Sequence, residues 1–204
     1  MKKILVLFTC FTLLLLTAGV QAQSELTKEE RSKAIDHLKT SQSDLMKTIK
    51  GLSEEQLKFK PNDETWSIEE CVEHIAISES AIFGIVEMSL KAEADPAKRD
   101  ELKFSDDQVI GLITNRDQKV KTREEFKPQN NFGSFDGSVK KFKEKRNDNI
   151  KYVKSTGDDL RNHYFEFPFG LVDSYQVILF LSGHSVRHTS QIKEIMAHES
   201  FPKS

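Results

Sequence analysis

The sequence predicts an all-α protein, and three observations favour a four-helix bundle. Apolar residues recur at intervals of three and four in four long segments of the 204-residue chain, which is the spacing of one face of an α-helix. Three of these segments begin with Thr, Ser or Asp followed three residues later by Glu or Gln, a pattern typical of a helix start. Strand signals are weak, the best being residues 163–167 before Pro168. Four helices of this kind can share one core.

Residues 1–22 have the features of a secretory signal peptide and are set apart from the single folded domain, residues 23–204. Two lysines precede an apolar run, residues 4–16, and a small-x-Ala cleavage signal ends at Ala22. The run has 13 residues, fewer than the roughly 20 that a spanning helix needs, so a retained anchor is the less favoured alternative. We expect an exported protein, periplasmic or secreted, with no stable membrane span after cleavage.

The first two helices are delimited by capping motifs and chain-breaking residues. The first is expected to begin at Thr27 and to end before Ser53, with apolar residues facing inward at intervals of three and four. The second is expected to begin at Ser67, directly after Trp66, and to end at Pro96. Proline disfavours the helical conformation of the residue before it, which explains the expected stop.

A long insertion separates the second helix from the third. Residues 97–131 are mostly polar, with one short helix expected over residues 105–116, and we expect this segment to lie over one end of the bundle. The third helix is expected after Ser138 and as far as Gly157, and the fourth over residues 173–197.

The fourth helix carries two histidines at ligand spacing. His184 and His188 occupy consecutive positions on its apolar line, one turn apart, so their Cβ atoms are expected about 5–6 Å from each other. A buried imidazole needs partners for a donor and an acceptor nitrogen. A metal ion would bind one nitrogen of each ring, and two separately hydrogen-bonded core histidines are the other interpretation. The spacing alone does not decide between them.

A third histidine on another helix favours the metal interpretation. His74 lies at the edge of the apolar face of the second helix, in line with small residues that leave room for a ligand. If the second and fourth helices pack together, His74 joins His184 and His188 in a three-histidine site with open coordination positions, as in catalytic zinc sites. We expect a divalent metal ion, with Zn²⁺ or Ni²⁺ favoured. The remaining histidines have no partner at ligand spacing and are expected on the surface or in loops: His37, His163 and His198.

Three motifs in the chain resemble those of one known family. They are Leu57-x-Phe59-x-Pro61, Trp66-Ser67-Ile68-x-Glu70-x-x-x-His74-Ile75 and Gly183-His184-x-x-x-His188-x-x-Gln191-Ile192. The sequence resembles the DinB/YfiT-like superfamily over residues 26–197. The resemblance implies an up-and-down-related four-helix bundle, a divalent metal bound near one end by His74, His184 and His188, and frequent homodimers. The signal segment and the insertion depart from the family pattern.

Four other side chains are candidates to support the site, each with two interpretations. Gln191 either orients a ligand or a metal-bound water, or bonds the backbone as a buried amide. Glu70 either accepts from His74 or acts as a base, although a role in the helix cap is favoured. Arg146 either binds an anionic substrate group or extends its charged end to solvent, which is favoured. Cys71 is expected to be a packed thiol rather than a ligand.

Composition and the expected site leave two classes of function. Thirty Lys and Arg against 32 Asp and Glu give a formal net charge of −2, so we expect no nucleic acid partner and instead a small-molecule substrate or ligand. The first class is a metal-dependent hydrolase that acts through a metal-bound water. The second is a non-catalytic protein that binds a metal or a small ligand. The resemblance adds a thiol S-transferase-like enzyme, which export disfavours because such thiols are kept reduced mainly in the cytosol.

Overall fold

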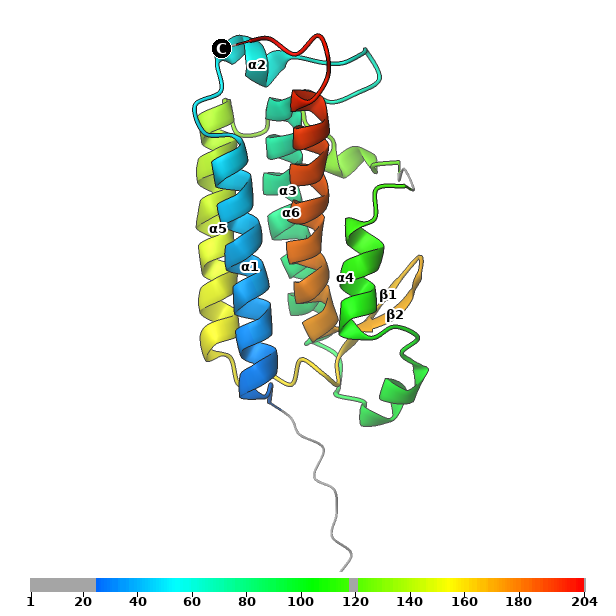
Figure 1. Cartoon of the computed structure of the whole chain (residues 1–204). Coiled ribbons are helices and arrows are strands. Elements are labelled where there is room, and N and C mark those ends of the chain that lie inside the picture. The colour runs from blue at the N-terminus through cyan, green and yellow to red at the C-terminus, as the bar shows by residue number, and fades with distance from the viewer. Residues whose placement is uncertain (1–24, 118–120, 204) are drawn as a thin grey trace, which may run out of the picture.

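The computed structural model describes residues 25–117 and 121–203. The predicted signal peptide, residues 1–22, lies outside this part of the chain. Within it, four long helices lie side by side and confirm the predicted four-helix bundle (Figure 1). None of the described helices is both long enough and apolar enough to span a membrane. The long helices are α1 (Lys28–Thr48), α3 (Ile68–Ser89), α5 (Phe135–Ser155) and α6 (Ser174–Met196).

In chain order the long helices run up, down, down and up (Figure 1). Both α1 and α3 pack against α5 and α6. Tyr175 at the start of α6 donates to the backbone oxygen of Glu30 at the start of α1, and Lys193 near the end of α6 pairs with Asp44 near the end of α1. These contacts show that α1 and α6 are parallel. This order differs from a simple up-and-down bundle. The long segment after α3 returns the chain to the end of the bundle at which α3 began, and α5 therefore runs in the same direction as α3.

The predicted capping motifs begin three of the long helices. The side chains of Thr27, Ser67 and Asp173 accept from the backbone N–H three residues further on, and the side chain of that residue accepts from the N–H of the cap. α3 ends at Ser89, short of the predicted stop at Pro96, because the intervening residues are mostly polar or small and give the helix little to bury. Pro96 instead occupies the first turn of a 3₁₀ helix.

The shorter elements were predicted in part. The expected helix at residues 105–116 is α4 (Asp106–Thr114), and the expected strand at residues 163–167 is β1 (Tyr164–Phe167). β1 pairs antiparallel with β2 (Gly170–Asp173), a strand that was not predicted. α5 begins at Phe135 rather than after Ser138 because the Ser134 side chain caps it. Three short helices were not predicted: α2 (Glu54–Lys58), η1 (Pro96–Glu101) and η2 (Glu124–Phe126).

The predicted position of the insertion over one end of the bundle is wrong. α4 packs along the side of α6 instead (Figure 1). Gly183 makes this approach close, since a Cβ atom at Gly183 would lie 2.4 Å from the Cγ2 atom of Ile113 on α4. A larger residue at this position would require the Ile113 side chain or the two helices to shift. The insertion thus covers the α6 face next to His184.

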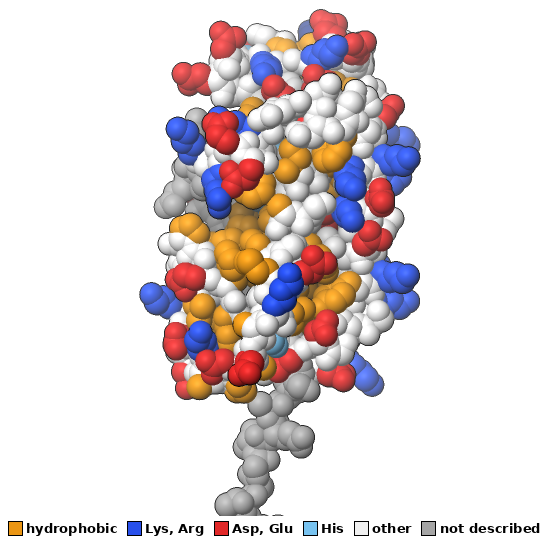
Figure 2. Space-filling model, turned by 180° about the vertical axis from the view of Figure 1, so that it is seen from behind, with side chains coloured by type: hydrophobic (Ala, Val, Ile, Leu, Met, Phe, Trp, Pro, Cys, Tyr) orange, Lys and Arg blue, Asp and Glu red, His pale blue; other side chains and the backbone are white. Residues whose placement is uncertain are grey.

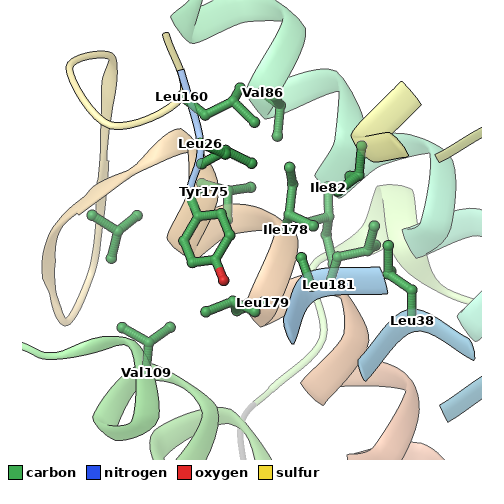
Figure 3. Packing of buried hydrophobic residues seen from close by; sticks show 14 residues of the cluster. Leu26, Leu38, Ile82, Val86, Val109, Leu160, Tyr175, Ile178, Leu179 and Leu181 are labelled. Carbon is green, nitrogen blue, oxygen red and sulfur yellow. The ribbon is translucent and has the colours of Figure 1, made fainter. Parts of the chain in front are cut away.

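Two clusters of buried apolar side chains fill the bundle. One lies at the end where α1 and α6 begin, with the Tyr175 ring between Leu26 and Leu179 (Figure 3). The other lies at the opposite end and contains Leu45 and Phe142. On each long helix, buried polar residues stand between the positions that belong to the two clusters: Ser41, Ser78, Glu79, Arg146, Asn149, Ser182 and Ser185. The interior is therefore apolar at both ends and polar in the middle.

Charged side chains of both signs are spread over the surface. Figure 2 shows Lys and Arg interspersed with Asp and Glu on the rear face, with hydrophobic side chains gathered between them. Among the described residues, the large hydrophobic side chains with the highest exposure are Met88 and Leu112, at 51% and 44%. This face does not present a uniformly positive field.

Candidate metal centre

The structure brings the three predicted ligands together. His74 lies on α3, and His184 and His188 lie one turn apart on α6, the helix with which α3 packs most extensively. One nitrogen from each ring lies within 4.8 Å of the others, and the Nε2 atoms of His74 and His184 are 3.2 Å apart. No other group of three His, Cys, Asp or Glu residues in the described ranges converges in this way.

Hydrogen bonds at the outer nitrogens orient two of the rings. His74 Nδ1 donates to the backbone oxygen of Phe126 at 2.8 Å, and His188 Nδ1 donates to Gln191 Oε1 at 2.9 Å. Donation from Nδ1 leaves the Nε2 lone pair of each ring free to bind a cation. Tetrahedral Zn²⁺ with Zn–N bonds of about 2.1 Å separates its ligand nitrogens by about 3.4 Å, close to the observed Nε2 separation. The donor set and its orientation therefore fit a divalent metal.

Burial keeps these imidazoles neutral. His74 and His188 are 4% and 8% exposed, whereas His184 is partly exposed. Burial and the neighbouring His74 lower the pKa of His188 to about 3. Burial, with His188 and His74 nearby, lowers the pKa of His184 well below its usual value, and burial also lowers that of His74 against the opposing hydrogen bond to Phe126. A neutral imidazole is the form that coordinates a metal, so the site is ready to bind near neutral pH.

Trp66 packs against one side of the site. Its ring centroid lies 4.8 Å from that of His74 and 6.1 Å from that of His188. On the other side, the Phe180 ring stacks at 6.4 Å from His184, one turn earlier on α6. Aromatic packing on both sides limits the rotation of the imidazoles, and the partly exposed His184 is the ligand nearest to solvent.

The predicted supporting roles of Gln191 and Glu70 have different outcomes. Gln191 Oε1 accepts from His188 Nδ1 at 2.9 Å, which is the contact that the predicted orienting role requires. Glu70 does not accept from His74, because the Phe126 carbonyl takes that proton. The Glu70 carboxylate accepts from the Ser67 N–H and pairs with Lys60, which confirms its favoured role in the helix cap.

Both interpretations of Arg146 are wrong. Its side chain is fully buried, so its charged end does not reach solvent, and it binds Glu79 rather than standing free for an anionic substrate. This pairing could not be predicted, because Glu79 lies on another helix and its position relative to Arg146 is set by the packing of the bundle. Cys71 is fully buried among apolar side chains and burial raises the pKa of its thiol, which confirms the predicted packed thiol.

Several contributors to the site were not predicted. The Phe126 carbonyl is a backbone atom that every residue type possesses, so the sequence carries no signal for its role. Glu73, next to His74, binds backbone N–H groups of residues 129–131. Burial raises the pKa of Glu73, but hydrogen bonds from Asn131 and its neighbours lower it by more, so it lies below the usual value. The remaining histidines lie outside the cluster, as predicted: His37, His163 and His198.

Comparisons with known proteins identify the fold and the family. The chain is 27% identical over 148 residues to the uncharacterized protein YuaE of Bacillus subtilis (strain 168), covering 72% of this chain and 87% of YuaE. YfiT of Bacillus subtilis, described as a probable metal-dependent hydrolase with an unusual four-helix bundle topology, has a similar fold with a TM-score of 0.56. Its sequence identity is 17%, and the similarity covers 84% of this chain and 89% of YfiT. The family model of the DinB superfamily matches residues 37–192, most of the chain including all three histidines, and the chain therefore belongs to the DinB superfamily.

Proposed function

We propose that this protein is an exported metal-dependent hydrolase whose divalent ion is bound by His74, His184 and His188. The observation that carries the proposal is the convergence of the three imidazoles, with the outer nitrogens of His74 and His188 already hydrogen-bonded. When bound, such an ion supplies Lewis-acid chemistry, polarising a carbonyl and lowering the pKa of water. The description of YfiT as a metal-dependent hydrolase supports the same class of reaction.

The residues of the chain divide the remaining tasks. Gln191 and the Phe126 carbonyl hold two ligand rings in the tautomer that presents Nε2. Trp66 packs over the rings of His74 and His188, and we place the substrate beside His184, the one ring of the three that is partly exposed. With three protein ligands, a zinc-like ion retains an open coordination position for the reacting group.

A non-catalytic metal-binding protein is the second candidate, and a specific observation favours it. The carboxylates that flank His74 on α3 are engaged elsewhere, since Glu70 caps the helix, Glu73 binds backbone N–H groups and Glu79 pairs with Arg146. None of these three serves as a general base in the described arrangement. Hydrolysis would therefore depend on the metal for activation of water. Thiol S-transfer is the third alternative and requires a thiol supplied outside the cytosol.

Export is part of the proposal and is supported by residues 1–22 alone. Two lysines, a 13-residue apolar run and a small-x-Ala signal form the three regions of a signal peptide. Sequencing of the N-terminus of the protein from its native host should give a start near Gln23. A retained Met1 in the membrane fraction would contradict cleavage.

Metal analysis followed by activity assays tests the function. The protein should be purified without a histidine tag, analysed for metals, and assayed on esters, amides and thiol acceptors before and after treatment with a chelator. We expect about one ion per chain, and hydrolysis that is lost with chelator and restored by Zn²⁺ or Ni²⁺. A bound ion without turnover of any substrate would favour the non-catalytic role, and the transfer of a thiol would favour the third alternative. A protein that binds no metal contradicts the proposal.

A further inference from the structure

Glu73 makes an unusual set of contacts for a carboxylate on a bundle helix. It is 7% exposed, and its Oε1 atom accepts from the backbone N–H groups of Gln129 and Asn131 at 3.1 and 2.6 Å. Its Oε2 atom accepts from the N–H of Asn130 at 3.1 Å, and the Asn131 side chain donates to Oε1 at 2.8 Å. Three successive backbone N–H groups thus converge on one carboxylate.

The backbone around Asn130 explains this convergence. Asn130 has φ of +59°, the one non-glycine residue with positive φ among the described residues. A left-handed residue within such a turn aims successive N–H groups into a concavity that binds anions. In this chain the anion is supplied by Glu73. Gln129, Asn130 and Asn131 are themselves exposed, so the contact to Glu73 is what binds these three residues to α3, whereas Phe132, the next residue, packs against the apolar cluster.

The same segment reaches the metal centre through its other end. Residues 124–131, here called the strap, contain η2 (Glu124–Phe126), which contacts α3. The Phe126 carbonyl accepts from His74 Nδ1 at 2.8 Å. Glu73 and His74 are adjacent in sequence, so α3 binds the strap at two points, once through a carboxylate and once through a proposed metal ligand.

We propose that Glu73 is a positioning residue for the metal centre. By anchoring the strap, it places the Phe126 carbonyl so that His74 carries its proton on Nδ1 and presents Nε2 to His184. Without the anchor, the strap moves, and His74 loses the partner that selects this tautomer. The inference rests on the proposed metal site, which it extends to a residue that touches neither the ion nor the substrate.

Two variants test the anchor from opposite sides. Glu73→Gln keeps the size of the side chain but replaces an oxygen acceptor with an amide donor that faces backbone N–H groups. Asn130→Val leaves Glu73 intact but disfavours positive φ, because a β-branched side chain is strained there. Asn130→Gly is the matched variant that accepts positive φ freely, and Glu87→Gln, an exposed change on the same helix, is the control for charge.

The measurements are the tautomer of His74 in the metal-free protein, from ¹⁵N NMR of the imidazole nitrogens, and the affinity for Zn²⁺. We expect Glu73→Gln and Asn130→Val to lose the uniform Nδ1–H tautomer and to bind Zn²⁺ about ten- to a hundredfold more weakly. Asn130→Gly and Glu87→Gln should match the wild type within about twofold, and circular dichroism should show the same helix content for all. A His74 that keeps its tautomer in Glu73→Gln overturns the inference. Wild-type protein that binds no Zn²⁺ contradicts the proposed function, whereas the tautomer measurement still decides the role of Glu73.

Discussion

The interior of the bundle contains two groups of buried polar side chains, and they satisfy their hydrogen-bonding atoms in opposite ways. Around Arg146, all five N–H donors are used: two bind the carboxylate of Glu79 at 2.7 Å, and the others bind Leu38 O, Ser41 Oγ and Ser185 Oγ. Asn149 adds a further bond to Glu79. Around the histidines, the outer nitrogens of His74 and His188 have partners while the inner nitrogens face one another.

This difference distinguishes a structural polar group from a binding site. A buried guanidinium with every donor satisfied has nothing left to offer a ligand, although it fixes the relative positions of α1, α3, α5 and α6. The three imidazoles converge with one nitrogen each, the Nε2 atoms of His74 and His184 lying 3.2 Å apart, and this is the arrangement that a divalent cation would complete. Both groups look alike in the sequence, where each is a polar residue on an apolar helix face. The structure distinguishes the two groups by how many of their polar side-chain atoms already have hydrogen-bond partners within the protein.

The largest effect on the free energy of unfolding is expected at Arg146. Arg146→Met keeps an unbranched apolar chain but leaves Glu79 buried without its partner, which should lower the free energy of unfolding by about 3–5 kcal/mol in urea denaturation. The double variant Arg146→Met/Glu79→Leu should recover most of that loss. Lys145→Met, at a partly exposed pair with Asp148, is the control and should change stability by less than about 1 kcal/mol. Equal losses for Lys145→Met and Arg146→Met would contradict the structural assignment.

The histidines should behave in the reverse manner, with a loss of metal rather than of the fold. We expect His74→Ala, His184→Ala and His188→Ala each to abolish stoichiometric binding while the metal-free bundle remains helical, because the apolar clusters at both ends are unchanged. Metal at a hundredfold excess over Kd should stabilise the wild type by about 2.7 kcal/mol and these variants hardly at all. The controls, which should retain the wild-type stoichiometry, are His37→Ala, His163→Ala and His198→Ala. Full occupancy in His74→Ala would show that the third ligand lies elsewhere.

Acid should lower the stability of the metal-free protein through the buried His188. The pKa of His188 is lowered to about 3 in the folded state and is about 6.5 in an unfolded chain, so the unfolded state binds more protons between these values. Stability that is fully present above pH 6.5 is therefore lost as pH falls, by about 2 kcal/mol at pH 5 for this residue. Urea titrations of metal-free wild type and His188→Asn should diverge in this way. Their difference removes the contribution of other groups, such as Asp173, whose pKa burial raises to about 6. Parallel pH profiles would show that His188 is not buried in its neutral form.

The smallest effect is expected on the affinity for Zn²⁺, at the hydrogen bond between His188 and Gln191. Gln191→Leu removes the acceptor of His188 Nδ1 and should weaken Zn²⁺ binding about tenfold with little change in helix content. Gln42→Leu removes a half-exposed amide on α1 and should leave the affinity unchanged. Isothermal titration with Zn²⁺ measures both. An unchanged affinity in Gln191→Leu would mean that His188 is oriented by packing against the neighbouring rings and not by this hydrogen bond.

Much of the fold and the convergence of the three histidines could be predicted, because both depend on periodicity. His184 and His188 share a face through their four-residue spacing, and His74 joins them once α3 packs on α6. The partners of Arg146 could not be predicted, because they come from three other helices and their register is set by the packing of the whole bundle. The position of α4 was missed for a similar reason, since the close approach depends on the missing Cβ of Gly183.

The order of the long helices has a consequence for how the chain folds as it is synthesised. The extensive contacts of α1 are with α5 and α6, which begin only at Phe135 and Ser174. α1, the first of the described helices to leave the ribosome, therefore exposes its apolar face, with Leu38 and Leu45, until the last helices have been made. Pairing of such distant segments slows folding and lengthens the time during which the chain can aggregate or bind a chaperone. Truncation of α6 should leave α1 and α3 without their principal partner, so this topology makes folding wait for the complete chain.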